Sequence, residues 1–306
     1  MIARLDNLRK SPVVFQHLTG LTVAVFDELA AQAVAAVEAA HRRKLERPER
    51  LRAVGGGDDF DLATVDQVLL TVVWLRQYPT NEALGFLFGV SDSTASRART
   101  RCLPVLEQAG KDAMRMPDPG AARRKRLPAL LKDTPGLAVV IDSFEQRTQR
   151  PKRRQRAYYS GKKKAHTLKS QVAVDEESGR IVDVSDSVPG PWADIKLLEM
   201  SRLLKRLPKG VGGIGDLGYV GIGELHPVGL GASPRRKPRG KDRPPEDRKY
   251  NRAFSRRRIV VEHAIGRLRR FRAVAHVNRH PRPGHALRVR AIAGLVNRML
   301  DHRAAS

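Results

Sequence analysis

Residues 137–143 read Leu-Ala-Val-Val-Ile-Asp-Ser, a continuous apolar run that stops at a carboxylate. Apolar, mostly β-branched residues in succession fit a strand covered on both faces, because a strand with one wet face would alternate apolar and polar residues. Asp142 is therefore predicted to lie at the end of a buried strand. Taken alone, the stretch favours an ordinary turn aspartate, and two later carboxylates change that interpretation.

The fourth predicted strand, like the first, ends on an aspartate. Residues 168–174 alternate in polarity and residues 181–184 are largely apolar, so with the turn at 176–179 they predict an antiparallel meander. A helix through residue 204 and a glycine-rich strand at 210–215 follow, and this strand ends at Asp216. Three strands, a helix and a fourth strand is the order of an RNase H-like sheet, whose first and fourth strands are neighbours.

The third carboxylate is Glu262, on a helix predicted at residues 255–272. At 100° per residue, Arg258 and Arg269 project close to the direction of Glu262. A glutamate between arginines is often only an ion pair along a helix. With the two strand aspartates it completes a set of oxygen ligands that suits Mg²⁺ or Mn²⁺. Two such ions support nuclease or strand-transfer chemistry on a phosphodiester.

The N-terminal part is predicted to be all helical. Apolar spacing predicts helices at 22–47 and 64–79, the second begun by a capping box of Thr64 and Gln67. Two more follow at 81–88 and 91–103, and Pro104 is expected to end the last one.

The last two of these helices form a candidate helix-turn-helix. The exposed face of the second one is predicted to carry Ser93, Arg97 and Arg101, a polar and basic set that a reader of the major groove presents. Packing of three helices with a solvated arginine face is the alternative, and the charge of the whole chain favours DNA binding.

Net charge is the outlier of the composition. Lys and Arg number 58 against 32 Asp and Glu, a formal charge of +26, which indicates a polyanionic partner such as nucleic acid. A single cysteine, Cys102, excludes an internal disulfide and a Cys-based zinc site. No run of 18 apolar residues and no secretory leader is evident, so we expect a cytoplasmic protein that works on the chromosome.

The predicted fold class is mixed α+β. We expect a helical DNA-binding domain at 1–110, a basic linker at 111–136 that includes Arg123-Arg124-Lys125-Arg126, and an RNase H-like, retroviral integrase-like catalytic domain at 137–306. Residues 226–254 are rich in Pro, Lys and Arg without periodicity and predict a basic insertion loop.

Five motifs in this order resemble the DDE transposases of the PIF/Harbinger-like branch found in bacterial insertion sequences. They are Asp142, Tyr-Ser-Gly-Lys-Lys-Lys-Ala-His at 159–166, Pro-Gly-Pro-Trp-Ala-Asp at 189–194, Gly-Asp-Leu-Gly-Tyr at 215–219 and Arg-Ile-Val-Val-Glu-His-Ala-Ile-Gly-Arg-Leu-Arg at 258–269. The resemblance covers most of residues 20–300.

The resemblance implies that Asp142, Asp216 and Glu262 form the catalytic, metal-binding triad, and that Arg258 and Arg269 are the basic residues accompanying the glutamate. Ser255 stands where related enzymes often have a tyrosine. Trp192 and Ala193 replace the more usual small residue and histidine, so Asp194 is interpreted as a helix cap rather than a ligand.

The implied function is a metal-dependent DNA endonuclease and strand transferase. It would bind the terminal inverted repeats of its element, cleave with two Mg²⁺ or Mn²⁺ ions, and join 3′ ends to target DNA as a homodimer or larger oligomer in the bacterial nucleoid. Basic tracts, among them Lys162, Lys163 and Lys164, are expected to contact phosphates. The alternatives are a transposase-derived DNA-binding protein that no longer cuts, and an RNase H-like nuclease.

Overall fold

The computed structural model describes residues 3–46, 60–120 and 127–305. Its elements group into two units, of which one comprises Met1–Ala113, Arg270–Ala275 and Arg290–Ser306 and the other Met114–Arg269 and His276–Val289. The helical unit therefore includes C-terminal residues in addition to the predicted 1–110. The linker tract at 123–126 lies outside the described residues, and the predicted functional boundaries stay predictions.

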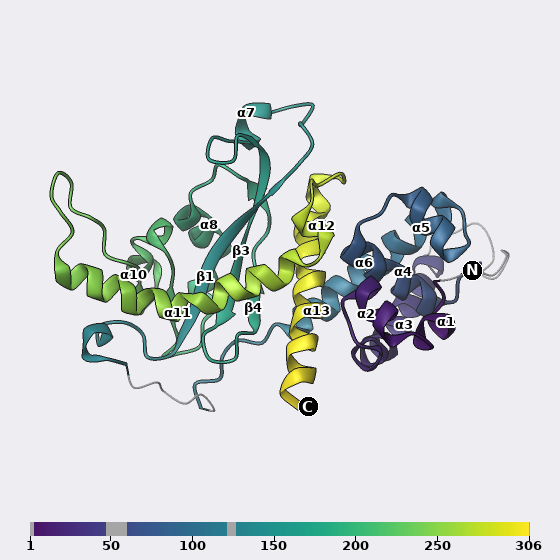
Figure 1. The fold of residues 1–306 in the computed structure, drawn as a ribbon, viewed down its shortest axis with the longest axis horizontal. Helices are drawn as coiled ribbons and strands as arrows, with labels where there is room; N and C mark the ends of the chain where they lie inside the picture. The colour runs from purple at the N-terminus through teal and green to yellow at the C-terminus, as the bar shows by residue number, and fades with distance from the viewer. Residues whose placement is uncertain (1–2, 47–59, 121–126, 306) are drawn as a thin grey trace. The chain divides into compact units, whose positions relative to one another are not determined.

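The helical unit confirms most of the predicted N-terminal helices (Figure 1). Thr22 accepts a hydrogen bond from the amide of Val25 at the start of α3, and Thr80 does the same for Ala83 at the start of α5. The elements are α1 (Leu5–Arg9), α2 (Pro12–Thr19), α3 (Val23–Leu45), α4 (Thr64–Gln77), α5 (Asn81–Phe88), α6 (Asp92–Ala113), α12 (Arg272–Ala275) and most of α13 (His285–Ala305).

Two details of the sequence prediction are wrong in this unit. Ala63, not Thr64, is the N-cap of α4, and Gln67 is buried, donating to the carbonyl of Leu62 rather than completing a capping box. Helix α6 also continues through Pro104 to Ala113. Gly110 and Gly294 touch backbone to backbone, since a Cβ on Gly294 would lie 2.3 Å from the Cα of Gly110. This close helix packing outweighs the local cost of the proline.

In the described part of the chain, one pair of helices has the length and apolar composition of a membrane span. None of its helices taken singly is long and apolar enough to cross a bilayer, whereas α2 and α3, bent by 60° at their junction, meet the length and composition test together.

The second unit is built on a sheet in the order β2-β3-β1-β6-β7, with β4 and β5 also paired to β3. Strands β1 and β3 are antiparallel, whereas β1 and β6 are parallel, so the predicted adjacency of the first and fourth strands is confirmed. The strands are β1 (Ala138–Arg147), β2 (Tyr159–Ser160), β3 (Ala165–Asp175), β4 (Ile181–Val184), β5 (Val188–Pro189), β6 (Gly212–Ile214) and β7 (Gly231–Ala232).

Short helices and one long helix complete this unit. The long helix α11 (Pro245–Arg269) runs along the sheet in Figure 1. The others are η1 (Ala129–Leu131), α7 (Gln155–Tyr158), α8 (Asp194–Ser201), α9 (Leu203–Arg206), η2 (Leu217–Tyr219), α10 (Ile222–Leu225) and η3 (Arg282–Gly284).

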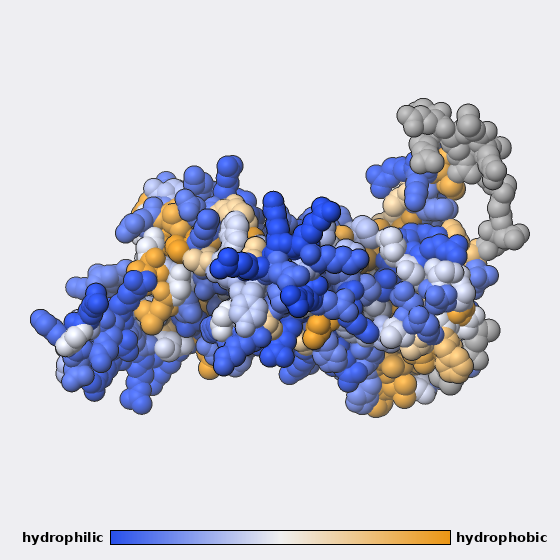
Figure 2. Space-filling view, turned by 90° about the horizontal axis from the view of Figure 1, so that it is seen from above, coloured by the Kyte–Doolittle hydropathy of each residue, from blue (hydrophilic) through white to orange (hydrophobic). Residues whose placement is uncertain are grey.

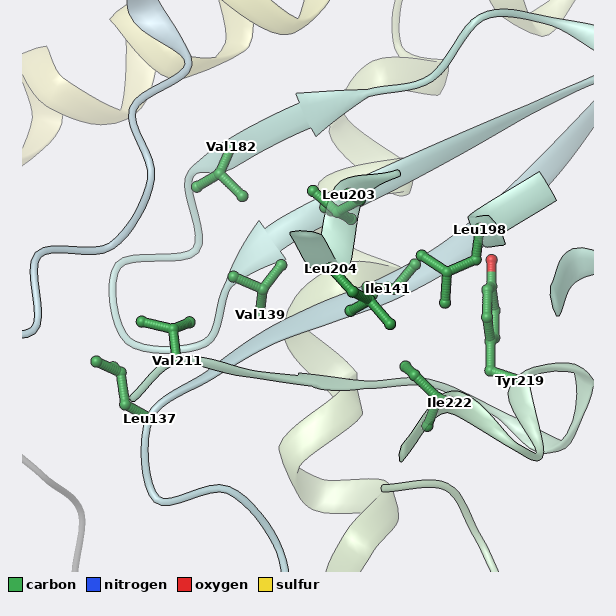
Figure 3. Packing of buried hydrophobic residues seen from close by; sticks show 11 residues of the cluster. Leu137, Val139, Ile141, Val182, Leu198, Leu203, Leu204, Val211, Tyr219 and Ile222 are labelled. Atoms are coloured by element: carbon green, nitrogen blue, oxygen red, sulfur yellow. The ribbon is translucent and has the colours of Figure 1, made fainter. Parts of the chain in front are cut away.

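The core of this unit uses the alternation of side chains along β1. Figure 3 shows Val139 and Ile141 among the leucines of α8 and α9, with Tyr219 and Ile222 at one side of the group. Neighbouring residues along a strand point to opposite faces, so the even-numbered residues of β1 face away from this cluster. Arg258 and Arg269 of α11 approach Asp142 and Phe144, which places α11 on that second face.

Helix α11 begins ten residues before its predicted start at 255, so the basic insertion loop predicted at 226–254 is partly wrong. Pro245 opens the helix, and Glu246 and Asp247 lie in its first turn, where carboxylates interact favourably with free backbone amides. Tyr250 and Phe254 are buried at a spacing of four. They continue the apolar stripe of α11 towards its N-terminus. The many basic residues around them obscured this helical spacing in the sequence.

Arg257 anchors α11 by a buried ion pair. Its guanidinium binds both carboxylate oxygens of Glu176, at 2.9 and 2.5 Å, and donates to the hydroxyl of Thr134 and the carbonyl of Pro135. The two side chains are only 6% and 7% exposed. The ion pair therefore joins α11 to the β3–β4 turn and to the segment that leads into β1.

We predict that Arg257→Ala lowers the free energy of unfolding by about 3–5 kcal/mol, because it leaves the Glu176 carboxylate buried without its charge partner. The neighbouring Arg256 is exposed, and Arg256→Ala should change the free energy by less than about 0.5 kcal/mol. Urea unfolding of the two variants measures the difference. Equal stabilities would show that the ion pair does not anchor the helix.

Candidate functional site

Asp142 lies within β1 rather than at its end. The pairing of β1 with β6 ends at Val140 and Ile214, while β1 continues to Arg147 beside β3. The predicted strand end was therefore wrong, because the long partner β3 supports residues beyond the apolar run. Asp142 occupies the position where one neighbour of β1 has stopped and the other continues.

Burial and neighbouring charges act on the Asp142 carboxylate. Oδ1 accepts a hydrogen bond from the amide of Ser143 at 2.7 Å, and Oδ2 lies 3.6 Å from a guanidinium nitrogen of Arg258. Burial raises the pKa of Asp142 to about 6, and the negative charges of Asp216 and Asp194 add to that rise. The Ser143 amide and Arg258 oppose it without cancelling it. Similar carboxylate clusters occur where cations bind.

Asp216 follows β6 after one residue, Gly215, at the level of Asp142 in the neighbouring strand. Val140 and Ile214 are register partners on parallel strands, and each aspartate comes two residues after its strand's partner. The side chain of Asp216 accepts from the amide of Gly218 at 2.8 Å and so caps η2. The predicted meeting of the two aspartates is therefore supported by register and by their electrostatic interaction.

Glu262 lies on α11 between the two arginines that approach β1. Arg258 is one turn before it, and Arg269, two turns after it, has its guanidinium 5.9 Å from the ring centre of Phe144. Glu262 itself is exposed. Within residues 3–46, 60–120 and 127–305, no three His, Cys, Asp or Glu side chains are already arranged to hold a metal ion. The role predicted for Glu262 stays a prediction.

Asp194 is not the helix cap that the sequence indicated. Ala193 is the N-cap of α8, and Asp194 is its first residue. Its Oδ1 accepts from the hydroxyl of Ser143 at 2.6 Å and from Nζ of Lys169 at 2.8 Å. Asp194 also interacts electrostatically with Asp142, and its Oδ2 borders Gly218 together with Oδ1 of Asp216, so it belongs to the same group. The signal in the sequence was its place at the end of the Pro-Gly-Pro-Trp-Ala-Asp motif at 189–194.

Tyr219 is a second residue that sequence reasoning missed. Its side chain is completely buried, and in the described part of the chain its hydroxyl makes no hydrogen bond of normal geometry, although Ser143 lies close enough to lower its pKa slightly. Burial raises its pKa well above the usual value, and Asp194, Asp142 and Asp216 raise it further. Figure 3 shows the hydroxyl at the margin of the apolar cluster. No carboxylate oxygen of the described residues is placed to accept from this buried donor, and a bound water or phosphate oxygen would satisfy it.

The proposed DNA-reading face lies on α6. Ser93 and Arg97 are exposed and hydrogen-bonded to each other at 2.9 Å. Arg101 is half-buried instead, because its guanidinium lies 3.8 Å from the ring centre of Phe60 and binds the side-chain oxygen of Gln67. All three stay candidates, and Arg97 is the most accessible arginine of the set.

The three lysines expected to contact phosphates lie in the turn between β2 and β3. Lys162, Lys163 and Lys164 are all exposed, and Lys164 has a positive φ of 47°. The tight turn therefore presents three cations on one tip. Hydrophilic side chains also cover most of the molecular face shown in Figure 2, which agrees with the high charge of the chain.

Comparisons with known proteins identify both units. Residues 141–297 match the family described as DDE superfamily endonuclease, and residues 61–112 match the helix-turn-helix of DDE superfamily endonuclease. A protein of Microchaete diplosiphon, named as a transposase for insertion sequence element IS702, is 33% identical over 76% of this chain and 79% of its own length. One of Streptomyces albus G, named as a transposase for IS112, is 27% identical over 74% and 77%. No solved structure matches.

We predict that Asp142→Asn stabilises the metal-free protein at pH 7. The pKa of Asp142 is about 6 in the folded protein and near 3.8 in the unfolded chain. Ionisation of this carboxylate therefore lowers the free energy of unfolding as pH rises between those two values, by about 1.4 kcal/mol per pH unit. The asparagine cannot ionise, so the free energy of unfolding should rise by up to about 3 kcal/mol at pH 7 and hardly change at pH 4.

Urea unfolding in EDTA at the two pH values measures this effect. Glu177→Gln, which neutralises an exposed turn carboxylate, is the matched control and should change little at either pH. A destabilised Asp142→Asn at pH 7 would contradict the electrostatic description of the site.

Proposed function

Because the chain belongs to the DDE superfamily of endonucleases, we propose that it is a transposase of the PIF/Harbinger-like branch that cuts and joins DNA with two divalent metal ions. The observation that carries the proposal is the parallel register of β1 and β6, whose last pair, Val140 and Ile214, stands two residues before Asp142 and Asp216 respectively. Membership of the family implies dependence on divalent metal in general.

The residues present fit a hard divalent cation. Asp142 and Asp216 offer carboxylate oxygens, and Glu262 lies on the helix whose arginines reach β1. Oxygen-only ligands match Mg²⁺ or Mn²⁺, and the unpartnered hydroxyl of Tyr219 indicates that the cluster is built to accept further oxygen atoms. When bound, two such ions activate a water or a 3′-hydroxyl and stabilise the leaving oxygen of the phosphodiester.

The protein's own residues position the substrate around this centre. Asp142 and Asp216 would hold the cation from two sides, because β1 and β6, the strands before them, are paired. Arg258, now 3.6 Å from Asp142, can turn its charge to a DNA phosphate once a cation neutralises that carboxylate. Arg269, exposed about three turns further along α11, extends the same basic face. Glu262, between them, completes the triad as α11 lies against β1.

Recognition of DNA is assigned to the helical unit. We propose that Ser93, Arg97 and Arg101 of α6 read bases in the terminal inverted repeats, since the helix-turn-helix match covers all three. Lys162, Lys163 and Lys164 contact phosphates of the repeat or of target DNA. We further propose that the chain acts in the bacterial cytoplasm, at the nucleoid, as a homodimer or larger oligomer on DNA.

We predict that Asp216→Asn and Glu262→Gln each abolish Mg²⁺-dependent cleavage of a duplex carrying the element's ends, because each removes a metal-holding charge. Duplex affinity should stay within about twofold, since neither residue contacts phosphate directly. Glu199→Gln, at an exposed position of α8, is the control and should cleave normally. Gel assays of cleavage and binding measure both. Full cleavage by either variant would remove that residue from the triad.

We predict that Arg97→Ala lowers the ratio of affinities for repeat and random DNA by about five- to a hundredfold, the range for one lost base contact. Replacing Lys162, Lys163 and Lys164 together should instead weaken both DNAs alike and flatten the salt dependence by up to about 2.7 in log-log slope. Fluorescence anisotropy across salt concentrations measures both effects. An unchanged ratio in Arg97→Ala would place the base reader elsewhere.

A further inference from the structure

We propose that Asp194 is a third metal-holding aspartate of this centre, with Lys169 as the positioning residue that holds its carboxylate in place. The inference rests on the proposed function and adds to it a residue outside the predicted triad. It begins from the packing of α8, η2 and the end of β6.

The carboxylates of Asp194 and Asp216 converge beside Gly218. A Cβ added to Gly218 would lie 2.7 Å from Oδ2 of Asp194 and 3.0 Å from Oδ1 of Asp216. Both oxygens therefore border the same small space, which the missing side chain of the glycine leaves open. Two carboxylate oxygens facing one space repel each other unless a cation lies between them.

The two oxygens of Asp194 have different surroundings. Oδ1 is held by Ser143 and Lys169, while Oδ2 has no hydrogen-bond partner in the described part of the chain. Lys169 is only 9% exposed on its side chain, and its Nζ also donates to the carbonyl of Trp192 at 2.5 Å. A ligating carboxylate is commonly held in this way, with one oxygen hydrogen-bonded and the other directed at the metal.

The loop before α8 is fixed tightly enough to place Asp194 accurately. Strand β5 pairs with β3, and the amide of Gly190 donates to the carbonyl of Thr167 at 3.0 Å. A Cβ on Gly190 would lie 1.8 Å from the Thr167 hydroxyl, so only glycine allows this approach. The chain therefore enters α8 at one position relative to β3, and Asp194 is its first helical residue.

Tyr219 provides a second, independent indication of a ligand. In the described residues its buried hydroxyl makes no hydrogen bond of normal geometry; Ser143 lies close enough to interact with it, but the Ser143 hydroxyl donates to Asp194. Charges of Asp194, Asp142 and Asp216 all act on this phenol. A buried phenol hydroxyl without an acceptor in place would donate to an oxygen ligand of a bound cation, such as water or phosphate.

The inference is tested on the whole protein with Mn²⁺ alone as the probe, by calorimetric titration without DNA. Asp194→Asn keeps the size and the hydrogen-bonding of the side chain and removes its charge. We expect it to weaken Mn²⁺ binding at least about tenfold, a loss that Glu199→Gln on the same helix should not show. Lys169→Met should also weaken binding, because the carboxylate loses its support.

The outcomes separate this inference from the proposed function. Asp216→Asn is titrated in parallel, with the melting temperature recorded for every variant to confirm folding. Weakened Mn²⁺ binding in both aspartate variants supports the inference. Normal binding by Asp194→Asn with weakened binding by Asp216→Asn overturns the inference alone. Normal binding by both overturns the metal centre itself, and with it the proposed mechanism.

Discussion

The parallel pairing of β1 with β6 is the constraint on which the rest of the site depends. Gly212 and Gly213 provide it, since a Cβ on the first would lie 2.3 Å from the ring of Pro135 and one on the second 2.6 Å from Leu204. Because β6 carries no side chains there, it fits between these groups and fixes its register with β1. That register directs Asp142 and Asp216, each two residues beyond the last pair, to the same edge of the sheet.

The remaining parts of the site are brought to the same point by charge. The buried ion pair of Arg257 and Glu176 fixes α11 to the sheet, so that Arg258 reaches Asp142. A second ion pair, with Lys169, holds Asp194. Two buried basic side chains, Arg257 and Lys169, therefore support a group of carboxylates that repel one another. This repulsion lowers the stability of the fold and provides a binding site for cations.

Local pattern was enough to predict the order of elements and the adjacency of the strands that precede Asp142 and Asp216. It failed where tertiary contacts outweighed local preference. The apolar run ends at Asp142, but β3 extends β1 to Arg147; Pro104 suggests a helix end, but the contact of Gly110 with Gly294 carries α6 onward. Asp194 was missed for a related reason, because no local spacing shows that Ser143 and Lys169 would meet it.

The central claim is that Asp142 and Asp216 jointly hold a divalent cation. Crystals of the protein soaked in Mn²⁺ and measured for anomalous scattering test it most directly. The account predicts an anomalous peak about 2.2 Å from a carboxylate oxygen of each aspartate, the usual Mn²⁺–oxygen distance being close to that for Mg²⁺. Strong peaks elsewhere with none between these two carboxylates would contradict it.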